Sequence, residues 1–125
     1  RDSYVEIDST LYIVGREDKS NLRRKPLSEV VAPLDKSKPI ILLDHQPYNL
    51  EETEANGVDI QFSGHTHQGQ VWPISLITKA IYENDHGFVE KGASSIYVSS
   101  GIGIWGGKFR IGTQSEYVVF NLKKQ

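Results

Sequence analysis

The pattern of apolar and polar positions predicts strands toward both ends of the chain. Residues 4–7 and 11–14 are short runs rich in β-branched and aromatic side chains, and the polar turn between them predicts a hairpin. Residues 40–43 are apolar at every position, which favours a central strand covered on both faces. Further strands are predicted, in chain order, at residues 58–62, 88–90, 96–99 and 116–122.

Three segments carry the apolar spacing of helices. Residues 26–34 place leucine and valine at intervals of three and four, and Pro33 should end or kink that helix. A brief helix is predicted up to Ala55, with Asn49 as its N-cap and Gly57 as its terminator. The spacing of apolar residues predicts an amphipathic helix at residues 74–82. Strands interspersed with helices, with no internal repeat or linker, predict one mixed α/β unit with a mixed sheet.

Composition narrows the classes of function. The 14 basic and 16 acidic residues are spread along the chain, so no charge field for nucleic acid or anionic lipid stands out, and we expect no nucleic-acid partner. The basic cluster Arg23-Arg24-Lys25 is expected to be a solvated loop. Without cysteine, a metal would have to use His, Asp, Glu or Asn. The aliphatic run at residues 40–43 is far shorter than the roughly 20 residues of a membrane helix.

Histidines follow two successive predicted strands. Asp44-His45-Gln46-Pro47 comes after the first strand, and Gly64-His65-Thr66-His67-Gln68-Gly69-Gln70 comes after the second. Imidazole suits first-row transition metals, and the glycines allow the backbone to turn sharply. Binding sites in helix-covered sheets form beyond the carboxyl ends of strands. If these two strands are neighbours, His45, His65 and His67 should therefore converge as metal ligands.

Other polar residues near these histidines have supporting roles in this interpretation. Asp44 should point away from the ligands, because adjacent residues on a strand end face opposite ways, so we expect a structural role or support for the ligands. Gln68 and Gln70 can orient ligands or contact substrate. Asp59 is expected to cap or pair, and His86 lies in a polar turn and is expected at the surface.

The glycine-rich segment 99–110 superficially offers a Gly-x-Gly phosphate loop. No helix pattern follows it, and the spacing of a P-loop is missing. We therefore expect a structural segment in which Trp105 packs and the glycines provide backbone clearance. Arg110 could reach an anionic substrate or form a surface salt bridge, and both interpretations remain open.

Taken together, the motifs resemble the calcineurin-like metallophosphoesterases, a family with a bacterial branch that often carries membrane helices before the catalytic domain. The resemblance implies a four-layer α/β/β/α sandwich with mixed sheets and a site for two divalent metals, Mn, Fe or Zn. By motif, His45 and His65 would bind the second metal and His67 would complete the first. The implied reaction is hydrolysis of phosphomonoester, phosphodiester or pyrophosphate bonds in a small molecule or lipid. The matching segments are Asp44-His45-Gln46-Pro47, Gly64-His65-Thr66-His67 with Gln68-Gly69-Gln70 and Pro73, Tyr97-Val98-Ser99-Ser100-Gly101, and Gly103, Trp105-Gly106 and Arg110-Ile111.

The chain also departs from the family pattern. The Asp-x-His, Gly-Asp and Gly-Asn-His motifs that supply the other ligands are missing, and so is any methionine. We therefore expect residues 1–125 to be a single unit, the C-terminal half of a catalytic domain whose N-terminal half is absent. Such a chain should contain no assigned catalytic residue, hold one metal or none, and be inactive alone.

A half-domain should seek partners for its uncovered surfaces. The missing half is the first expected partner, and a homodimer or domain swap is expected for the isolated chain. The alternative function is a non-catalytic binding or assembly module with one structural metal or none. Location stays open: the resemblance favours a membrane-associated bacterial parent, while the chain itself is expected to be soluble.

Overall fold

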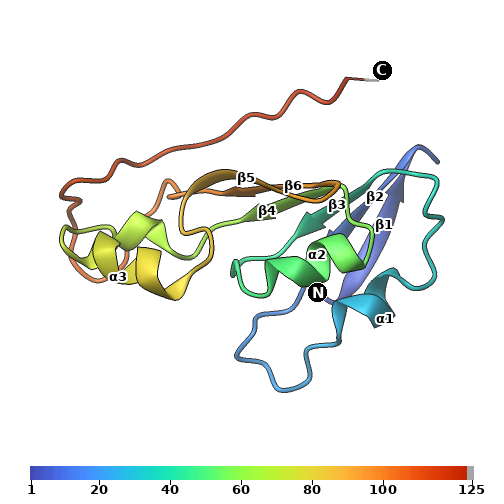
Figure 1. Ribbon diagram of the computed structural model, residues 1–125, viewed down its shortest axis with the longest axis horizontal. Helices are drawn as coiled ribbons and strands as arrows, with labels where there is room; N and C mark the ends of the chain where they lie inside the picture. Colours follow the sequence, from blue (N-terminus) through green and yellow to red (C-terminus); the bar gives the residue numbers. More distant parts are fainter. Residues whose placement is uncertain (124–125) are drawn as a thin grey trace.

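A six-stranded mixed sheet organises the computed structural model, which describes residues 1–123 (Figure 1). The strand order is β1-β2-β3-β4-β6-β5; the outer pairs β1/β2 and β5/β6 are antiparallel, and the inner pairs are parallel. This arrangement confirms the predicted mixed α/β class. The strands are β1 (Ser3–Ile7), β2 (Leu11–Gly15), β3 (Ile40–Leu43), β4 (Ile60–Ser63), β5 (Gly87–Lys91) and β6 (Ser94–Val98).

Helices α1 (Leu27–Val31) and α2 (Leu50–Ala55) cover one face of the sheet (Figure 1). The apolar stripe predicted at residues 26–34 is buried, and it packs with β2, β3 and the segment just before β4. Burying an aliphatic side chain of this size stabilises the fold by about 1.5–3 kcal/mol. The helix ends before Pro33, as predicted. The core cluster comprises Tyr12, Val14, Leu27, Val30, Val31, Leu34, Ile40, Leu42 and Val58.

Asn49 precedes α2 but does not cap it. Its backbone is left-handed, with φ 51° and ψ 53°, and its side chain makes no capping hydrogen bond. The amide instead donates to the Glu52 carboxylate over 3.1 Å. A capping side chain normally requires an extended backbone at the cap residue, so Asn49 occupies the predicted N-cap position without forming the capping hydrogen bond. Gly57 follows the helix with φ 65°, a conformation that glycine adopts without a steric cost.

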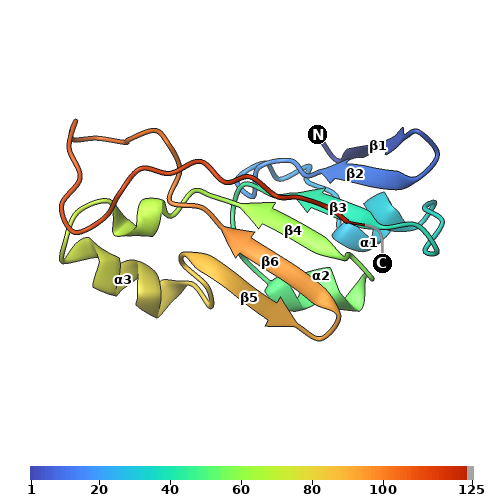
Figure 2. The same cartoon turned by 90° about the horizontal axis from the view of Figure 1, so that it is seen from above.

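Residues 116–122 do not form the predicted strand. The segment crosses the sheet face opposite the helices (red in Figures 1 and 2), where the Phe120 ring lies 4.2 Å from Phe62 and 5.5 Å from Tyr97, centroid to centroid. A backbone that passes over a face, instead of along an edge, cannot form a hydrogen-bonded ladder. Its aromatic side chains pack, but its peptide groups do not pair as a strand.

This opposite face is only partly covered. In β3, Ile41 is buried, but Leu43 is 47% exposed, so the prediction of a strand covered on both faces fails at its carboxyl end. Val5 on β1 and Phe88 on β5 are also more than half exposed. Residues 1–123 thus form one mixed sheet with helices α1 and α2 on one side.

Candidate metal centre

His45 and His65 meet beyond the carboxyl ends of β3 and β4. These strands are parallel neighbours, as the predicted convergence requires, and the Gly64 amide donates to the His45 carbonyl over 3.0 Å. The Nδ1 atom of His65 lies 3.2 Å from Nε2 of His45, and the rings are nearly perpendicular at 82°. Both residues are exposed. The fold therefore presents two imidazoles side by side at an open edge of the sheet.

His67 does not join this pair as a third ligand of one ion. Within residues 1–123, no three His, Asp or Glu side chains form a group that could hold a metal. His67 instead starts the short helical turn η1 (His67–Gly69), and its ring Nδ1 lies 3.4 Å from Nη2 of Arg110. The expected convergence of three histidines is thus only partial: two meet, and the third lies against an arginine.

Arg110 ties the histidine turn to the glycine-rich segment. Its Nη1 donates to the His67 carbonyl over 3.2 Å. Its Nη2 lies within hydrogen-bond distance of three more carbonyls, those of Ser100, Gly101 and Gly103, at 2.8, 3.1 and 2.7 Å. The guanidinium faces carbonyls of its own chain, and it forms no ion pair with any residue in 1–123, so the interpretation of a surface salt bridge is wrong. Contact with an anionic substrate stays a prediction.

The backbone of the histidine turn is unusual. His65, His67, Gln68 and Gln70 all have φ between 51° and 69°, a left-handed region that residues with a side chain rarely adopt. Such conformations persist only where surrounding contacts impose them, and they cluster at functional sites. Gly69 has φ 75°, and a β-carbon there would lie 2.3 Å from the Ser75 nitrogen. The turn therefore requires glycine at this position to pack against the next helix.

Gln70 holds the glycine-rich segment in place. This side chain is buried, accepts a hydrogen bond from the Trp105 amide over 2.8 Å, and donates to the carbonyls of Trp105 and Gly107. The segment has the structural character that the sequence predicted, and no helix follows it within residues 1–123. The expectation that Trp105 packs is wrong, because this residue is 58% exposed. Gln70 hydrogen-bonds only to the backbone of Trp105, and these bonds leave the indole ring free to face outward.

Asp44 is buried behind the histidine pair. Its carboxylate contacts the guanidinium groups of Arg16 and Arg24. Arg23 and Lys25 are exposed in a loop, as predicted, but Arg24 between them is half-buried and also donates to the Glu17 carbonyl over 2.7 Å. Asp59 also has a partner, since its carboxylate accepts a hydrogen bond from the Ile40 amide over 2.7 Å. Asp44 is therefore fully engaged in fixing the loop that carries His45.

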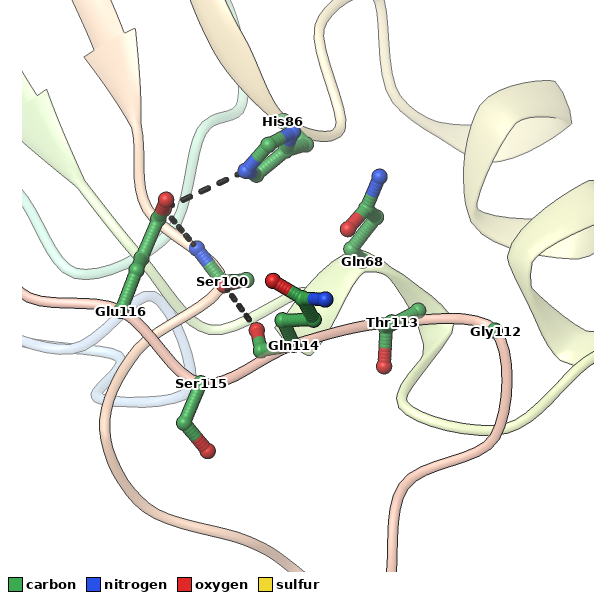
Figure 3. Close-up of a pocket in the computed structure, with 8 residues that line it drawn as sticks. All are labelled: Gln68, His86, Ser100, Gly112, Thr113, Gln114, Ser115 and Glu116. Carbon is green, nitrogen blue, oxygen red and sulfur yellow. Dashed lines mark hydrogen bonds and ion pairs between the residues drawn. The ribbon is translucent and has the colours of Figure 1, made fainter.

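A cavity of about 540 Å³ lies beside the histidine turn, with Gln68 on its wall (Figure 3). Glu116 accepts a hydrogen bond from the Ser100 amide over 2.8 Å, and its carboxylate lies 3.2 Å from Nε2 of His86. Burial alone would raise the pKa of Glu116, but the Ser100 hydrogen bond and the other partners of the carboxylate outweigh it, so the pKa is lowered overall. His86 is half-buried against this carboxylate, which corrects the expectation that it lies free at the surface.

The protonation of the histidines suits metal binding. Burial lowers the pKa of His65, and the nearby His45 lowers it further, against an opposing effect of Asp18. Burial also lowers the pKa of His67, with the Arg110 guanidinium as the second cause. Lower pKa values favour neutral imidazole, which is the form with a lone pair available for a metal.

Sequence reasoning missed several neighbours of this site. Arg16 and Arg24 come from the loop after β2, far along the chain from Asp44, and no local spacing indicates that they converge on it. The Tyr82 ring lies 6.4 Å from that of His65, and its hydroxyl lies 3.0 Å from that of Tyr48. Burial and this hydrogen bond raise the pKa of Tyr82 to about 12, so it stays protonated.

The fold is that of a mixed α/β protein with two imidazoles beyond the ends of adjacent parallel strands, where binding sites form in such sheets. Sequence relatives identify the family. An uncharacterized metallophosphoesterase of Helicobacter pylori is 43% identical over 90 residues, which are 70% of this chain and 24% of that protein. One of Campylobacter jejuni is 37% identical over 116 residues, which are 89% of this chain and 31% of that protein. The chain belongs to the calcineurin-like metallophosphoesterase superfamily.

The relatives also bear on chain length and membrane association. This chain spans less than a third of the length of the Helicobacter and Campylobacter proteins. A zebrafish relative named as a transmembrane protein with a metallophosphoesterase domain is 34% identical over 69% of this chain and 20% of that protein. In residues 1–123, no helix has the length and apolar character needed to cross a membrane. No family model and no solved structure matches the chain.

Proposed function

We propose that the full-length protein containing this chain hydrolyses phosphoester bonds at a two-metal site, and that this chain supplies His45, His65 and His67. The observation that carries this proposal is the 3.2 Å approach of the His45 and His65 nitrogens at the strand ends. Family membership supports phosphoester hydrolysis as the reaction class. The finer assignment of ligands to two ions follows the motif resemblance.

The side chains present fit part of such a centre. Two exposed imidazoles can bind one divalent transition metal, and His67 can bind another. Bound metals in such sites lower the pKa of water and polarise phosphoryl oxygens. Arg110 would hold the His67 ring in position, and the buried Asp44 would fix the loop that carries His45. Because Asp44 is engaged by two arginines, the carboxylates that complete the centre have to come from the remainder of the protein.

The expected partner of this chain is the remainder of the full-length protein, which would supply the missing ligands. The relatives are several times longer than the matched region, so most of their length lies outside it. We infer that this additional chain covers the partly exposed sheet face that carries Val5, Leu43 and Phe88. In isolation, the same face would favour a homodimer or a domain swap. Light scattering of the isolated chain would distinguish these states from a monomer.

The proposed substrate rests on the motif resemblance, and the proposed location rests on two other relatives. We infer a phosphorylated small molecule or a lipid as substrate, and a membrane-associated parent, because related proteins are named as transmembrane proteins with a metallophosphoesterase domain. The absence of a three-ligand group within residues 1–123 favours a second candidate function. In that case the chain is a non-catalytic binding or assembly module that holds one structural metal or none.

Hydrolysis of bis(p-nitrophenyl) phosphate tests the proposal. The full-length protein, loaded with Mn²⁺ or Zn²⁺, should be active, and this chain alone should be inactive. His65→Ala should remove activity and lower the metal content of the full-length protein, whereas the matched His86→Ala variant should retain both. Equal activity and metal content in wild type and His65→Ala would refute the proposed ligand set. A full-length protein that is loaded with metal and hydrolyses nothing would favour the non-catalytic candidate.

A further inference from the structure

Helix α3 (Ile74–Ile81) exposes its apolar stripe. The predicted amphipathic helix is present, but none of its residues is buried. Helices of this kind normally place their apolar side against a core or a membrane interface. The helix lies at one end of the molecule, away from the layer formed by α1 and α2 (Figure 1).

The glycine-rich segment extends this apolar region. The Trp72 amide donates to the Ile111 carbonyl over 2.8 Å, and Val71 and Ile111 form an isolated parallel bridge, so the start of residues 71–82 is joined to the end of residues 101–112. Figures 1 and 2 show both segments at the same end of the molecule. We call the combined region the α3 surface. Eight of its large apolar residues are each more than half exposed: Trp72, Leu76, Ile77, Ile81, Ile102, Trp105, Phe109 and Ile111.

The charges of the α3 surface all have one sign. Residues 71–82 and 101–112 contain Lys79, Lys108 and Arg110 and no aspartate or glutamate, although the whole chain carries a net charge of -2. Arg110 is turned inward onto carbonyls, while Lys79 and Lys108 are exposed. The overall charge balance in the sequence conceals this local distribution. Glu83, directly after residue 82, pairs with Lys91 over 2.8 Å, so its charge is offset. The cations within the two segments make the apolar surface complementary to an anionic one.

We propose that the α3 surface docks on an anionic lipid bilayer. Tryptophan favours the membrane interface, where its ring is half in apolar and half in polar surroundings, and both tryptophans of the chain lie on this surface. Lysines near an anionic leaflet strengthen such binding. Protein interfaces, in contrast, are depleted in lysine. Docking does not depend on hydrolysis, because neither His45 nor His65 belongs to this surface.

The position of the α3 surface has a consequence for the proposed enzyme. The turn with His67 leads directly into residues 71–82, and Gln70 ties that turn to Trp105. Docking through Trp72 and Trp105 would bring His67 close to the headgroup layer. If the proposed phosphoesterase function holds, a phosphate group at the bilayer surface would then be within reach of the metal centre.

Tryptophan fluorescence tests the docking directly, because Trp72 and Trp105 are the only tryptophans of the chain. The chain without metal is mixed with vesicles of phosphatidylcholine and phosphatidylglycerol, with or without bromine on the acyl chains. We expect binding to the mixed vesicles, a blue shift of the emission, and quenching by the brominated lipid. Binding without quenching, or no binding at all, would overturn the proposal.

Matched variants separate the apolar and charged contributions. Leu76→Gln should weaken binding about tenfold, while Leu22→Gln, at a fully exposed position on another loop, should leave it unchanged. Lys79→Gln/Lys108→Gln should weaken binding to anionic vesicles roughly 25-fold, at about fivefold per lysine, and Arg23→Gln/Lys25→Gln should have a much smaller effect. Circular dichroism of each variant confirms folding. Equal losses in the target and control variants would contradict docking through the α3 surface.

Two other possible occupants of the α3 surface would give different fluorescence results. A blue shift that depends on protein concentration in the absence of vesicles would assign the α3 surface to a second copy of the chain. Protection of both tryptophans from acrylamide in the full-length protein, without vesicles, would assign it to another part of that protein. Either result would overturn bilayer docking. The phosphodiester assay above uses a water-soluble substrate, so a failure of docking is distinguishable from a failure of the proposed enzyme function.

Discussion

Helices α1 and α3 have the same apolar periodicity but opposite surroundings. Leu27 on α1 is 1% exposed and packs under the sheet, whereas Leu76 on α3 is 60% exposed. Spacing at intervals of three and four predicts a helix in both cases, but it does not reveal what the apolar side faces. Helix α1 therefore belongs to a region that stabilises the fold, whereas α3 belongs to a region available for binding. The histidine turn lies next to α3.

Truncating Leu27 should have the largest effect and sharpen this comparison. Leu27→Ala should lower the free energy of unfolding by about 2–5 kcal/mol, because it leaves a cavity in the packed core. Leu76→Ala should change it by about 0.5 kcal/mol or less, since the side chain is exposed. Urea denaturation measures both values. A large loss for Leu76→Ala would show that α3 is packed and not open.

Gly69→Ala should have the next largest effect, and it acts where the histidine turn joins α3. The added methyl group would clash with the Ser75 backbone, and alanine disfavours φ 75°. We expect a loss of about 1–3 kcal/mol in unfolding free energy. Gly15→Ala provides a control, because a β-carbon added there would meet nothing within 4 Å and its φ is not in the left-handed region. Similar losses for both variants would contradict a specific requirement at Gly69.

Replacing Arg110 should affect metal binding more than folding. Arg110→Lys cannot span the His67, Ser100 and Gly103 carbonyls together, so the His67 ring loses its fixed orientation. Removing a group that orients a ligand typically costs 10- to 100-fold in metal affinity, and we expect about tenfold for the ion at His67. Calorimetry with Zn²⁺ on the full-length protein measures this change.

Arg23→Lys is the matched control for Arg110, because Arg23 is exposed. Free guanidinium should partly restore zinc binding in Arg110→Ala, since it can occupy the vacated position between the carbonyls. A purely structural role would not show this rescue. Unchanged zinc affinity in both Arg110 variants would contradict the positioning role.

The pH dependence of stability should show the smallest effect. The folded-state pKa values of His65 and His67 lie below the ordinary histidine value of 6.5, mainly through burial. The unfolded chain therefore takes up protons first as pH falls below 6.5, and stability decreases until the folded-state pKa values are passed. Above pH 6.5 these two groups contribute no pH dependence. Denaturation of wild type and His65→Gln/His67→Gln between pH 5 and 8 should show a shallower slope in the variant.

The sequence predicted most elements because their signals are local. The hairpin at the start of the chain, the stripe of α1 and the short strands before His45 and His65 are all present in the structure. The predicted strand at residues 116–122 is wrong, since an extended segment also needs an edge to pair with. Residue type alone does not specify that edge.

The sequence predicted part of the candidate site, as it predicted part of the fold. Adjacent parallel strands bring His45 and His65 together, as strand order along the chain suggested. The contacts of Arg110 with His67 and of Arg24 with Asp44 join residues 43 and 20 positions apart. Such long-range pairings arise from packing, so the sequence indicated the ligands but not the groups that position them.

Titration of the full-length protein with Zn²⁺, monitored by the assigned imidazole ¹⁵N signals in NMR spectra, tests most directly whether this chain supplies metal ligands. Neutral imidazoles that bind a metal change their nitrogen shifts at the ligating atom. We predict that the signals of His45 and His65 shift together as zinc is added, while those of His86 stay in place. Unchanged signals of His45 and His65 in excess zinc, or an equal response of His86, would contradict a metal centre at the ends of β3 and β4.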